Sequence, residues 1–291
     1  MTYYQFTEAV EDRIKEVVNG NISVGIYTAD KNNGTIRKGI ILKDEEVNLA
    51  PTIYLEEYYE RYISGCSLEY ITSDILRIYQ KVCFQKSWDE SCVNEYNKIK
   101  DKIIYRIINR EANQKMLSEM PFVPYLDLAI VFYVLLDMSS DGTATMAIRT
   151  EHLERWEVSE EEVYEQAKKN TVRLLPDEFL TMSAVIQEFV TDEVEMENDR
   201  MFVLSNCIRS YGAATILYRG RLEAIGMYLE SNYYVLPSSI HEVIIVPESE
   251  APGIHVLSAM VREVNETQVM DEEVLSDHAY YYDRKKKMLC M

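Results

Sequence analysis

The sequence predicts an α+β protein with two lobes, and three observations support this fold class. Apolar residues recur at steps of three and four in some segments, which indicates helices, and they alternate or run continuously in others, which indicates strands. These helices and strands come in groups rather than in a regular strand–helix repeat. Pro121 and Pro124 interrupt the chain between two such groups. We therefore expect an N-terminal lobe over residues 1–120 and a C-terminal lobe over residues 121–291.

The N-terminal lobe is predicted to hold a hairpin with helices. Apolar side chains at helical spacing predict a helix over residues 3–18, which Asn19 and Gly20 end. Residues 22–26 and 35–42 read as two strands around a turn at residues 31–34. Helices are expected over residues 56–63 and 67–82. Ser87 and Glu90 form a capping box that predicts a third helix, whose apolar face would be Val93, Tyr96, Ile99, Ile103 and Ile107.

The C-terminal lobe is predicted to hold a mixed or antiparallel sheet with helices on one side. Its most distinct element is the apolar run of residues 125–136, which is typical of a strand buried on both faces. A hairpin turn and a return strand follow at residues 139–149. Ser159 and Glu162 begin a further helix. We also expect a helix at 177–190, an acidic connector at 191–200, a strand pair at 233–236 and 243–246, a late helix at 257–264, a closing strand at 278–282 and a basic tail at 284–287.

The charge of the chain bears on its partners. The formal net charge is −19, and residues 151–200 contribute −10 of it, from 15 Asp or Glu against five Lys or Arg. Such a surface repels phosphates of nucleic acids and anionic lipid headgroups, so direct binding to nucleic acid or to a membrane is not expected. The general interpretation is a well-solvated acidic surface. An acidic mimic of nucleic acid is the alternative.

Export and membrane signals were sought in the sequence. The first residues lead directly into the predicted helix without a basic start or an apolar stretch, so no signal peptide is expected. The longest apolar run is much shorter than the roughly 20 residues of a membrane helix. The five cysteines include no CxxC pair, and Cys83 and Cys92 are expected to line helix faces. These features predict a cytoplasmic protein with reduced thiols.

Familiar catalytic motifs are missing from the sequence. It contains no P-loop, no GxGxxG, no GxSxG and no HExxH. Without a glycine-rich loop between a strand and a helix, a nucleotide phosphate has no evident binding loop. We therefore predict no cofactor, and the usual nucleotide-binding and zinc-protease chemistries are disfavoured.

One short polar segment, Ser238 to Glu242, is the candidate catalytic site. His241 could act as a base, Ser239 as a nucleophile or oxyanion donor, and Glu242 as an accompanying carboxylate. Ser239 and His241 would share a face on an extended chain. The alternative interpretation is a hairpin turn in which the serines bond nearby backbone groups.

Two weaker sites were also considered. His241, Asp277 and His278 could supply metal ligands, but their spacing matches no known pattern, and Asp277 and His278 could simply cap a turn and begin the last strand. Tyr54, Tyr58 and Tyr62 recur at steps of four. These tyrosines could form a protein-binding stripe or pack in the core of the lobe.

Several strings in the chain resemble an uncharacterised bacterial family, domain of unknown function 5688. They are the opening Met1-Thr2-Tyr3, Pro51 to Leu55, Tyr125 to Tyr133, Leu236 to Val243 and Leu275 to His278. The resemblance covers nearly the whole chain and implies a bacterial cytoplasmic protein, typical of anaerobic gut bacteria and their mobile elements. Residues 125–265 are also distantly similar to domain of unknown function 1444. Neither family supplies a catalytic residue.

The sequence thus leads to a functional expectation with two alternatives. We expect a non-enzymatic protein-interaction or accessory protein, because familiar chemistry is missing, the surface is acidic and the chain is rich in tyrosine, with 22 copies. The partner would be another protein. The first alternative is a hydrolase-like enzyme that uses Ser239 and His241, and the second is the nucleic-acid mimic.

Overall fold

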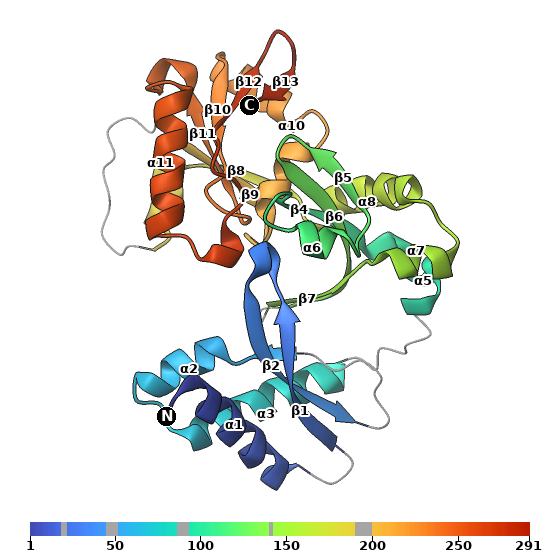
Figure 1. Ribbon diagram of the computed structural model, residues 1–291. Coiled ribbons are helices and arrows are strands. Elements are labelled where there is room, and N and C mark those ends of the chain that lie inside the picture. Colours follow the sequence, from blue (N-terminus) through green and yellow to red (C-terminus); the bar gives the residue numbers. More distant parts are fainter. Residues whose placement is uncertain (19–21, 45–51, 86–92, 140–141, 190–199) are drawn as a thin grey trace. The chain divides into compact units, whose positions relative to one another are not determined.

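The computed structural model describes residues 1–18, 22–44, 52–85, 93–139, 142–189 and 200–291 (Figure 1). Helices and antiparallel sheets occur together, so the predicted α+β class is confirmed. By their contacts the residues form two compact units, of which the first comprises residues 1–31 and 35–99, and the second comprises residues 32–34 and 100–291. The boundary expected at Pro121 falls inside the second unit.

In its described residues the first unit combines helices with a three-stranded sheet, where the sequence predicts a hairpin with helices. Thr2 and Gln5 form a capping box that starts α1. The strands pair antiparallel in the order β1-β2-β3, and the predicted turn lies between β1 and β2. The elements include α1 (Tyr3–Val17), β1 (Ile22–Asp30), β2 (Ile36–Asp44), β3 (Thr52–Tyr54), α2 (Glu56–Ile63) and α3 (Leu68–Gln85). The turn η1 (Asn32–Gly34) between β1 and β2 is grouped with the second unit.

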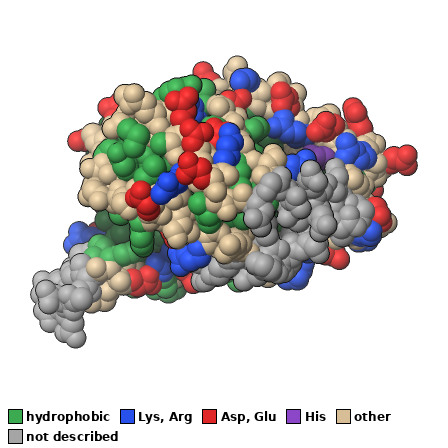
Figure 2. All heavy atoms as spheres, turned by 90° about the horizontal axis from the view of Figure 1, so that it is seen from below, with side chains coloured by type: hydrophobic (Ala, Val, Ile, Leu, Met, Phe, Trp, Pro, Cys, Tyr) green, Lys and Arg blue, Asp and Glu red, His purple; other side chains and the backbone are tan. Residues whose placement is uncertain are grey.

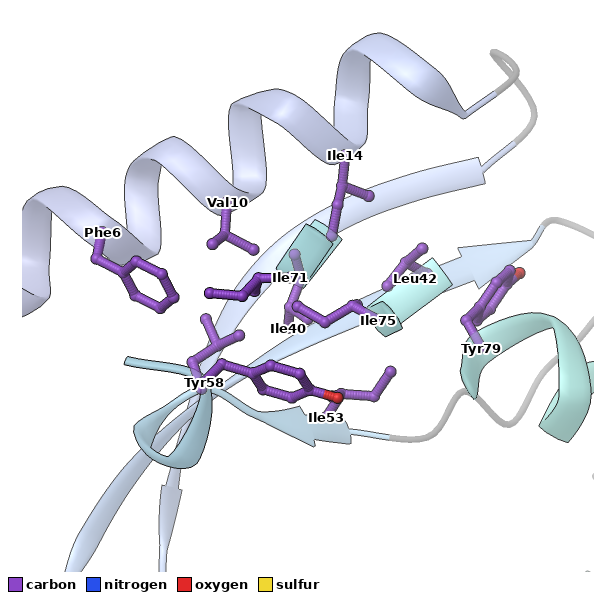
Figure 3. Packing of buried hydrophobic residues seen from close by; sticks show 11 residues of the cluster. Phe6, Val10, Ile14, Ile40, Leu42, Ile53, Tyr58, Ile71, Ile75 and Tyr79 are labelled. Carbon is purple, nitrogen blue, oxygen red and sulfur yellow. The ribbon is translucent and has the colours of Figure 1, made fainter. Parts of the chain in front are cut away.

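An apolar core holds the first unit together (Figure 3). The face of α1 that carries Phe6, Val10 and Ile14 meets β2 and α3, and these three side chains are fully buried. Each such side chain stabilises the fold by roughly 1.5–3 kcal/mol. The other buried members are Ile40, Leu42, Ile53, Leu55, Tyr58, Ile71, Ile75 and Tyr79.

The third predicted helix of the N-terminal lobe is wrong in its last part. The start expected at Ser87 and Glu90 lies outside the described residues. Among the described residues, 93–94 and α5 (Tyr96–Ile99) are helical, and after η2 (Lys100–Lys102) the chain forms strand β4 (Ile103–Asn109). Ile99, Ile103 and Ile107 lie at steps of four and favour a helix, but Ile104 and Ile108 place apolar side chains on the other face of a strand. Residues 103–108 are all buried, Arg106 included, although β4 pairs only with β6 among the described strands.

The second unit begins with a four-stranded antiparallel sheet. The predicted buried strand is confirmed as β6, and β4, β5 and β7 all pair with it. Phe132 of β6 meets Tyr164 of α8, while Ala129 and Val131 pack against Leu117 and Met120. The elements are α6 (Gln114–Leu117), β5 (Phe122–Tyr125), β6 (Leu128–Ser139), β7 (Gly142–Ala147), α7 (Thr150–Trp156) and α8 (Glu160–Leu174).

A six-stranded antiparallel sheet follows, in the order β13-β12-β10-β11-β9-β8. The helix expected at 177–190 is wrong in its first part, because Pro176 precedes a strand that pairs with β9, and only α9 is helical. The predicted pair at 233–236 and 243–246 is confirmed. The strands are β8 (Asp177–Thr181), β9 (Phe202–Asn206), β10 (Tyr233–Leu236), β11 (Val243–Pro247), β12 (Tyr280–Asp283) and β13 (Met288–Cys290).

Helices and short turns complete the second unit. The late helix is confirmed as α11, which packs on the six-stranded sheet against β10 (Figure 1). The expected basic tail is instead a turn between β12 and β13, because the Asp283 carboxylate accepts the N–H groups of Lys285 and Lys286. The remaining elements are α9 (Met182–Gln187), η3 (Gly212–Leu217), α10 (Arg221–Leu229), η4 (Glu248–Glu250), α11 (Ile254–Thr267) and η5 (Asp271–Glu273).

Further expectations concern the acidic connector, two cysteines and the lack of a membrane helix. Most of the acidic connector at 191–200, and the side chains of Cys83 and Cys92, lie outside the described residues. Among the helices that are described, none is long and apolar enough to cross a membrane.

Candidate functional site

A short loop after β9 forms one wall of the candidate site. Asn206 ends the strand and is buried. Its side-chain oxygen accepts the N–H groups of Ile208 and Ser210, and its Nδ2 donates to the Ser210 carbonyl at 2.9 Å. These bonds shape a loop in which Arg209 and Tyr211 have φ angles of 48° and 52°. A side-chain-bearing residue in this left-handed region is strained, and the strain persists only where the surroundings fix the backbone.

The ring of Tyr211 is held by a buried cation. The Arg106 guanidinium of β4 lies 3.6 Å from the Tyr211 ring centroid and 4.2 Å from that of Tyr133. Arg106 also donates to the Thr145 hydroxyl at 3.1 Å. A desolvated cation–π contact contributes up to about 2 kcal/mol. This contact therefore helps to keep Tyr211 in its strained conformation.

The segment from Ser238 to Glu242 forms the opposite wall as a turn between β10 and β11. The Ser239 hydroxyl accepts the backbone N–H of His241 and donates to Glu242 Oε1, each at 2.9 Å. This is the bonding pattern of the hairpin-turn interpretation. The side chain of Ser239 is thus engaged by its own turn, and its hydroxyl bonds the backbone of His241 rather than the ring.

The His241 ring is held from two sides. The N–H of Tyr211 donates to Nδ1 at 3.2 Å, and Nε2 lies 3.3 Å from Glu273 Oε1. Because Nδ1 accepts a hydrogen bond, the neutral ring carries its hydrogen on Nε2. This N–H donates a hydrogen bond to the Glu273 carboxylate. Both ring nitrogens are therefore engaged by the protein itself.

Gly212 allows the loop and the turn to approach each other. A Cβ built on this glycine would lie 2.1 Å from Ser205 Oγ and 2.5 Å from the carbonyl oxygen of His241. The Ser205 hydroxyl donates to that same carbonyl at 2.7 Å, and the Ala213 N–H donates to the Ile240 carbonyl. Only a residue without a side chain fits this close backbone contact.

An open pocket of about 380 Å³ lies between these segments. Arg209 at its edge is paired with Glu188 and lies 3.5 Å from Glu178, so its charge is balanced. The hydrogen bond between Arg209 and Glu188 raises the pKa of Arg209 and lowers the pKa of Glu188. The lining residues are Arg209, Ser238, Ser239, His241, Glu242, Gln268, Val269 and Glu273.

The three predicted catalytic residues thus line one pocket, but they do not form a nucleophile–base pair in this arrangement. A serine nucleophile needs its hydroxyl within hydrogen-bond reach of a free ring nitrogen. Here Nδ1 of His241 accepts the Tyr211 N–H and Nε2 faces Glu273, while Ser239 bonds Glu242. The pocket presents fixed polar groups to a ligand, which suits recognition.

The proposed metal ligands are not brought together. Asp277 accepts a hydrogen bond from Asn265 Nδ2 at 2.8 Å, and His278 is exposed just before β12. In the part of the chain that the structure describes, no three His, Cys, Asp or Glu side chains are arranged to hold a metal ion. His241, Asp277 and His278 therefore form no metal set there.

The three tyrosines do not form one stripe. Tyr54 ends β3 and lies under the Lys31 ammonium, 3.7 Å from its ring centroid. Tyr58 and Tyr62 are on α2, where Tyr58 is a buried member of the first core and Tyr62 packs against that core. The arrangement matches the core-packing interpretation rather than a shared binding surface.

The sequence did not point to four other residues that line the pocket, Arg209, Gln268, Val269 and Glu273, nor to Tyr211, which bonds the His241 ring. The string Asn206 to Gly212 carried a usable signal, since asparagine and glycine mark tight turns. Glu273 carried none, because it lies 32 positions from His241 in the chain and reaches it only through tertiary folding.

The fold is that of an α+β protein whose second unit holds an open polar pocket. The chain belongs to the family of unknown function DUF5688, whose profile matches residues 3–284. No curated protein and no solved structure gives a significant match. The distant similarity to domain of unknown function 1444 stays a prediction.

Proposed function

We propose that this protein is a non-enzymatic interaction protein that binds a partner protein through the pocket around His241. The observation that carries the proposal is an open polar pocket whose potential catalytic groups are all bonded to the protein itself. Groups fixed in this way bind a ligand without loss of their own side-chain entropy. They are poorly placed to move a proton.

A partner protein fits the charge of the chain better than a nucleic acid does. The net charge of −19 disfavours phosphate backbones. The nucleic-acid mimic would need carboxylates in a row like phosphates along one face. On the face that Figure 2 presents, acidic and basic side chains lie intermixed, which favours a general protein surface over a mimic.

The cellular compartment in which the protein works is also a proposal. Free cysteines among the described residues are Cys66, Cys207 and Cys290, in keeping with the reduced thiols that the sequence predicts. Burial raises the pKa of the Cys207 thiol, which makes it a weak nucleophile at neutral pH. We propose a role in the bacterial cytoplasm, with the link to mobile elements resting on the family resemblance alone.

One variant pair tests the recognition pocket. Gln268→Trp places a large side chain at the pocket mouth, while Glu263→Trp puts the same side chain on the exposed surface of α11 away from the pocket. In affinity capture from the native host followed by mass spectrometry, we expect one protein to be retained by the wild type and by Glu263→Trp. Gln268→Trp should retain at least about tenfold less of it, which corresponds to about 1.4 kcal/mol, because the new side chain blocks access to the pocket.

The hydrolase alternative has one observation in its favour, since Ser239, His241 and Glu242 line the same pocket. It requires the Ser239 hydroxyl to leave the His241 N–H and reach the ring. A hydrolytic turnover by the purified protein that His241→Ala abolishes, with the fold intact, would replace the interaction proposal. Equal capture by both tryptophan variants would show that the partner does not use the pocket.

A further inference from the structure

The segment Asp271 to Leu275 is held in an unusual way. It contains the short turn η5 and no strand pairing, yet each of its five carbonyl groups accepts a hydrogen bond. Three asparagine side chains and one backbone N–H supply the donors. The bonds are Asn33 to Asp271 at 2.7 Å, Asn32 to Glu272 at 2.7 Å, the Ile240 N–H to Glu273 at 2.9 Å, Asn33 to Val274 at 2.7 Å, and Asn109 to Leu275 at 3.2 Å.

A fourth asparagine orients two of these donors. Asn113 is buried, with 2% of its surface exposed, and its Nδ2 donates to the side-chain oxygens of Asn32 and Asn33 at 2.8 and 2.9 Å. Its own oxygen accepts the Asn33 N–H at 2.8 Å. Because Asn113 occupies the oxygens of both side chains, their NH₂ groups must point toward the 271–275 segment.

The turn Asn32–Gly34 is built to present these amides. Asn33 has φ 58° and ψ 29°, the left-handed conformation that asparagine tolerates better than most residues. The turn belongs to the second unit, although it joins strands β1 and β2 of the first. Residues early in the chain therefore fix a segment about 240 positions later.

Glu273 is the central residue of the fixed segment. Its carbonyl accepts the N–H of Ile240 from the pocket turn, and its carboxylate faces Nε2 of His241 at 3.3 Å. Bonds to the carbonyls on either side of Glu273 leave its backbone little freedom. The asparagines thus act on the pocket wall without touching the pocket, since they are not among its lining residues.

We propose that Asn32 and Asn33, ordered by Asn113, are positioning residues that set Glu273 against His241 and so fix the geometry of the recognition pocket. The proposal rests on the proposed function in treating this pocket as a binding site. The positioning role itself can be tested without any partner, because it concerns the orientation of one histidine ring and one turn.

Asn33→Gly tests the proposal. Glycine keeps the left-handed turn and removes both side-chain donors. We expect hydrogen exchange of the Ile240 amide, which bonds Glu273, to become at least about tenfold faster, because two hydrogen bonds to the segment are lost. We also expect the ring ¹⁵N shifts of His241 to depart from the wild-type pattern of a protonated Nε2 and a proton-free Nδ1.

Asn232→Ala is the matched control. Asn232 also uses its side chain to hold a turn of the second unit, with bonds to Glu248 and to the Arg284 N–H, but it does not contact the 271–275 segment. This variant should leave the Ile240 exchange rate and the His241 shifts as in the wild type. If Asn33→Gly lowers the melting temperature but changes neither reading, the asparagines only stabilise the fold and the proposal is wrong.

Two further results distinguish the positioning role from an effect on folding and from the binding of a partner. Should Asn33→Gly not fold, Asn32→Ala removes a single donor, to Glu272, and should show the same changes with smaller size. If the Asn33 variant alters His241 as expected while Gln268→Trp still captures the partner, the positioning role stands and the proposed function fails.

Discussion

The core of the first unit and the pocket of the second are stabilised in opposite ways. The core gathers apolar side chains of α1, β2, α2 and α3, where close packing and exclusion of water do most of the work (Figure 3). The segments that form and support the pocket walls are held by hydrogen bonds from side chains to backbone, such as Ser205 to His241 and Asn33 to Val274. The scaffold of this chain therefore depends on a periodic pattern of apolar residues, whereas its site depends on individual hydrogen bonds.

The largest expected effect tests the apolar side of this comparison. Phe6→Ala removes a fully buried ring from α1, which should lower the free energy of unfolding by about 4 kcal/mol, through lost burial and the cavity left behind. Val17→Ala on the same helix is the control, because Val17 is 60% exposed, and it should cost less than about 0.5 kcal/mol. Denaturant unfolding measures both. Similar losses for the two variants would show that this core does not carry the unit.

The next effect tests whether the pocket depends on backbone approach. Gly212→Ala would place a methyl group against the His241 carbonyl and the Asn206 N–H, so the loop or the turn must shift. We expect a loss of about 3 kcal/mol, the upper end of the usual cost of overpacking, together with changed His241 resonances. Gly25→Ala in β1 is the matched control, since its Cβ would meet nothing within 4 Å. Its stability should stay within about 0.5 kcal/mol of the wild type. Unchanged His241 resonances in Gly212→Ala would count against the close-packed pocket.

The smallest effect is a pH dependence in the first unit. Burial raises the pKa of Asp74, but hydrogen bonds from Arg61 and Arg77, at 3.0 and 2.6 Å, outweigh it and lower the pKa overall. A carboxyl whose folded pKa is depressed stabilises the protein above its unfolded pKa of about 3.9, and this stability is lost as the pH falls through the folded value.

Asp74→Asn should therefore reduce stability at neutral pH by less than about 1 kcal/mol and flatten its decline between roughly pH 5 and pH 2. Thermal unfolding across this range measures the effect. A variant whose stability falls with acid as steeply as that of the wild type would show that the Asp74 pairs contribute nothing.

The sequence anticipated the elements of the first unit better than those around the pocket. The boundaries of α1 and α2, the β1–β2 turn and the strand pair β10–β11 follow from local spacing and turn residues. The spacing of Ile103 and Ile107 predicts a helix, and only pairing with β6 shows that this segment is strand β4. Pro124 suggested a boundary, yet it lies in β5 at the edge of a sheet, where a proline costs no ladder bond.

The candidate site was anticipated in part. The Ser238 to Glu242 segment was identified, because polar residues between two strands stand out in a sequence. Its chemistry was not, since the role of His241 depends on Tyr211 and Glu273, which approach it only in the folded chain. Nothing local relates Asn33 to Glu273.

By itself, the sequence determined the α+β class, the acidic charge, most helix and strand positions and the short polar turn at Ser239. These properties depend on composition and on contacts between near neighbours in the chain. The tertiary structure alone decided that β4 is a strand, that His241 is fixed between Tyr211 and Glu273, and that an early asparagine turn holds Asp271 to Leu275. Hydrogen bonds between segments up to 241 positions apart leave no periodic trace, because each depends on a single pair of residues.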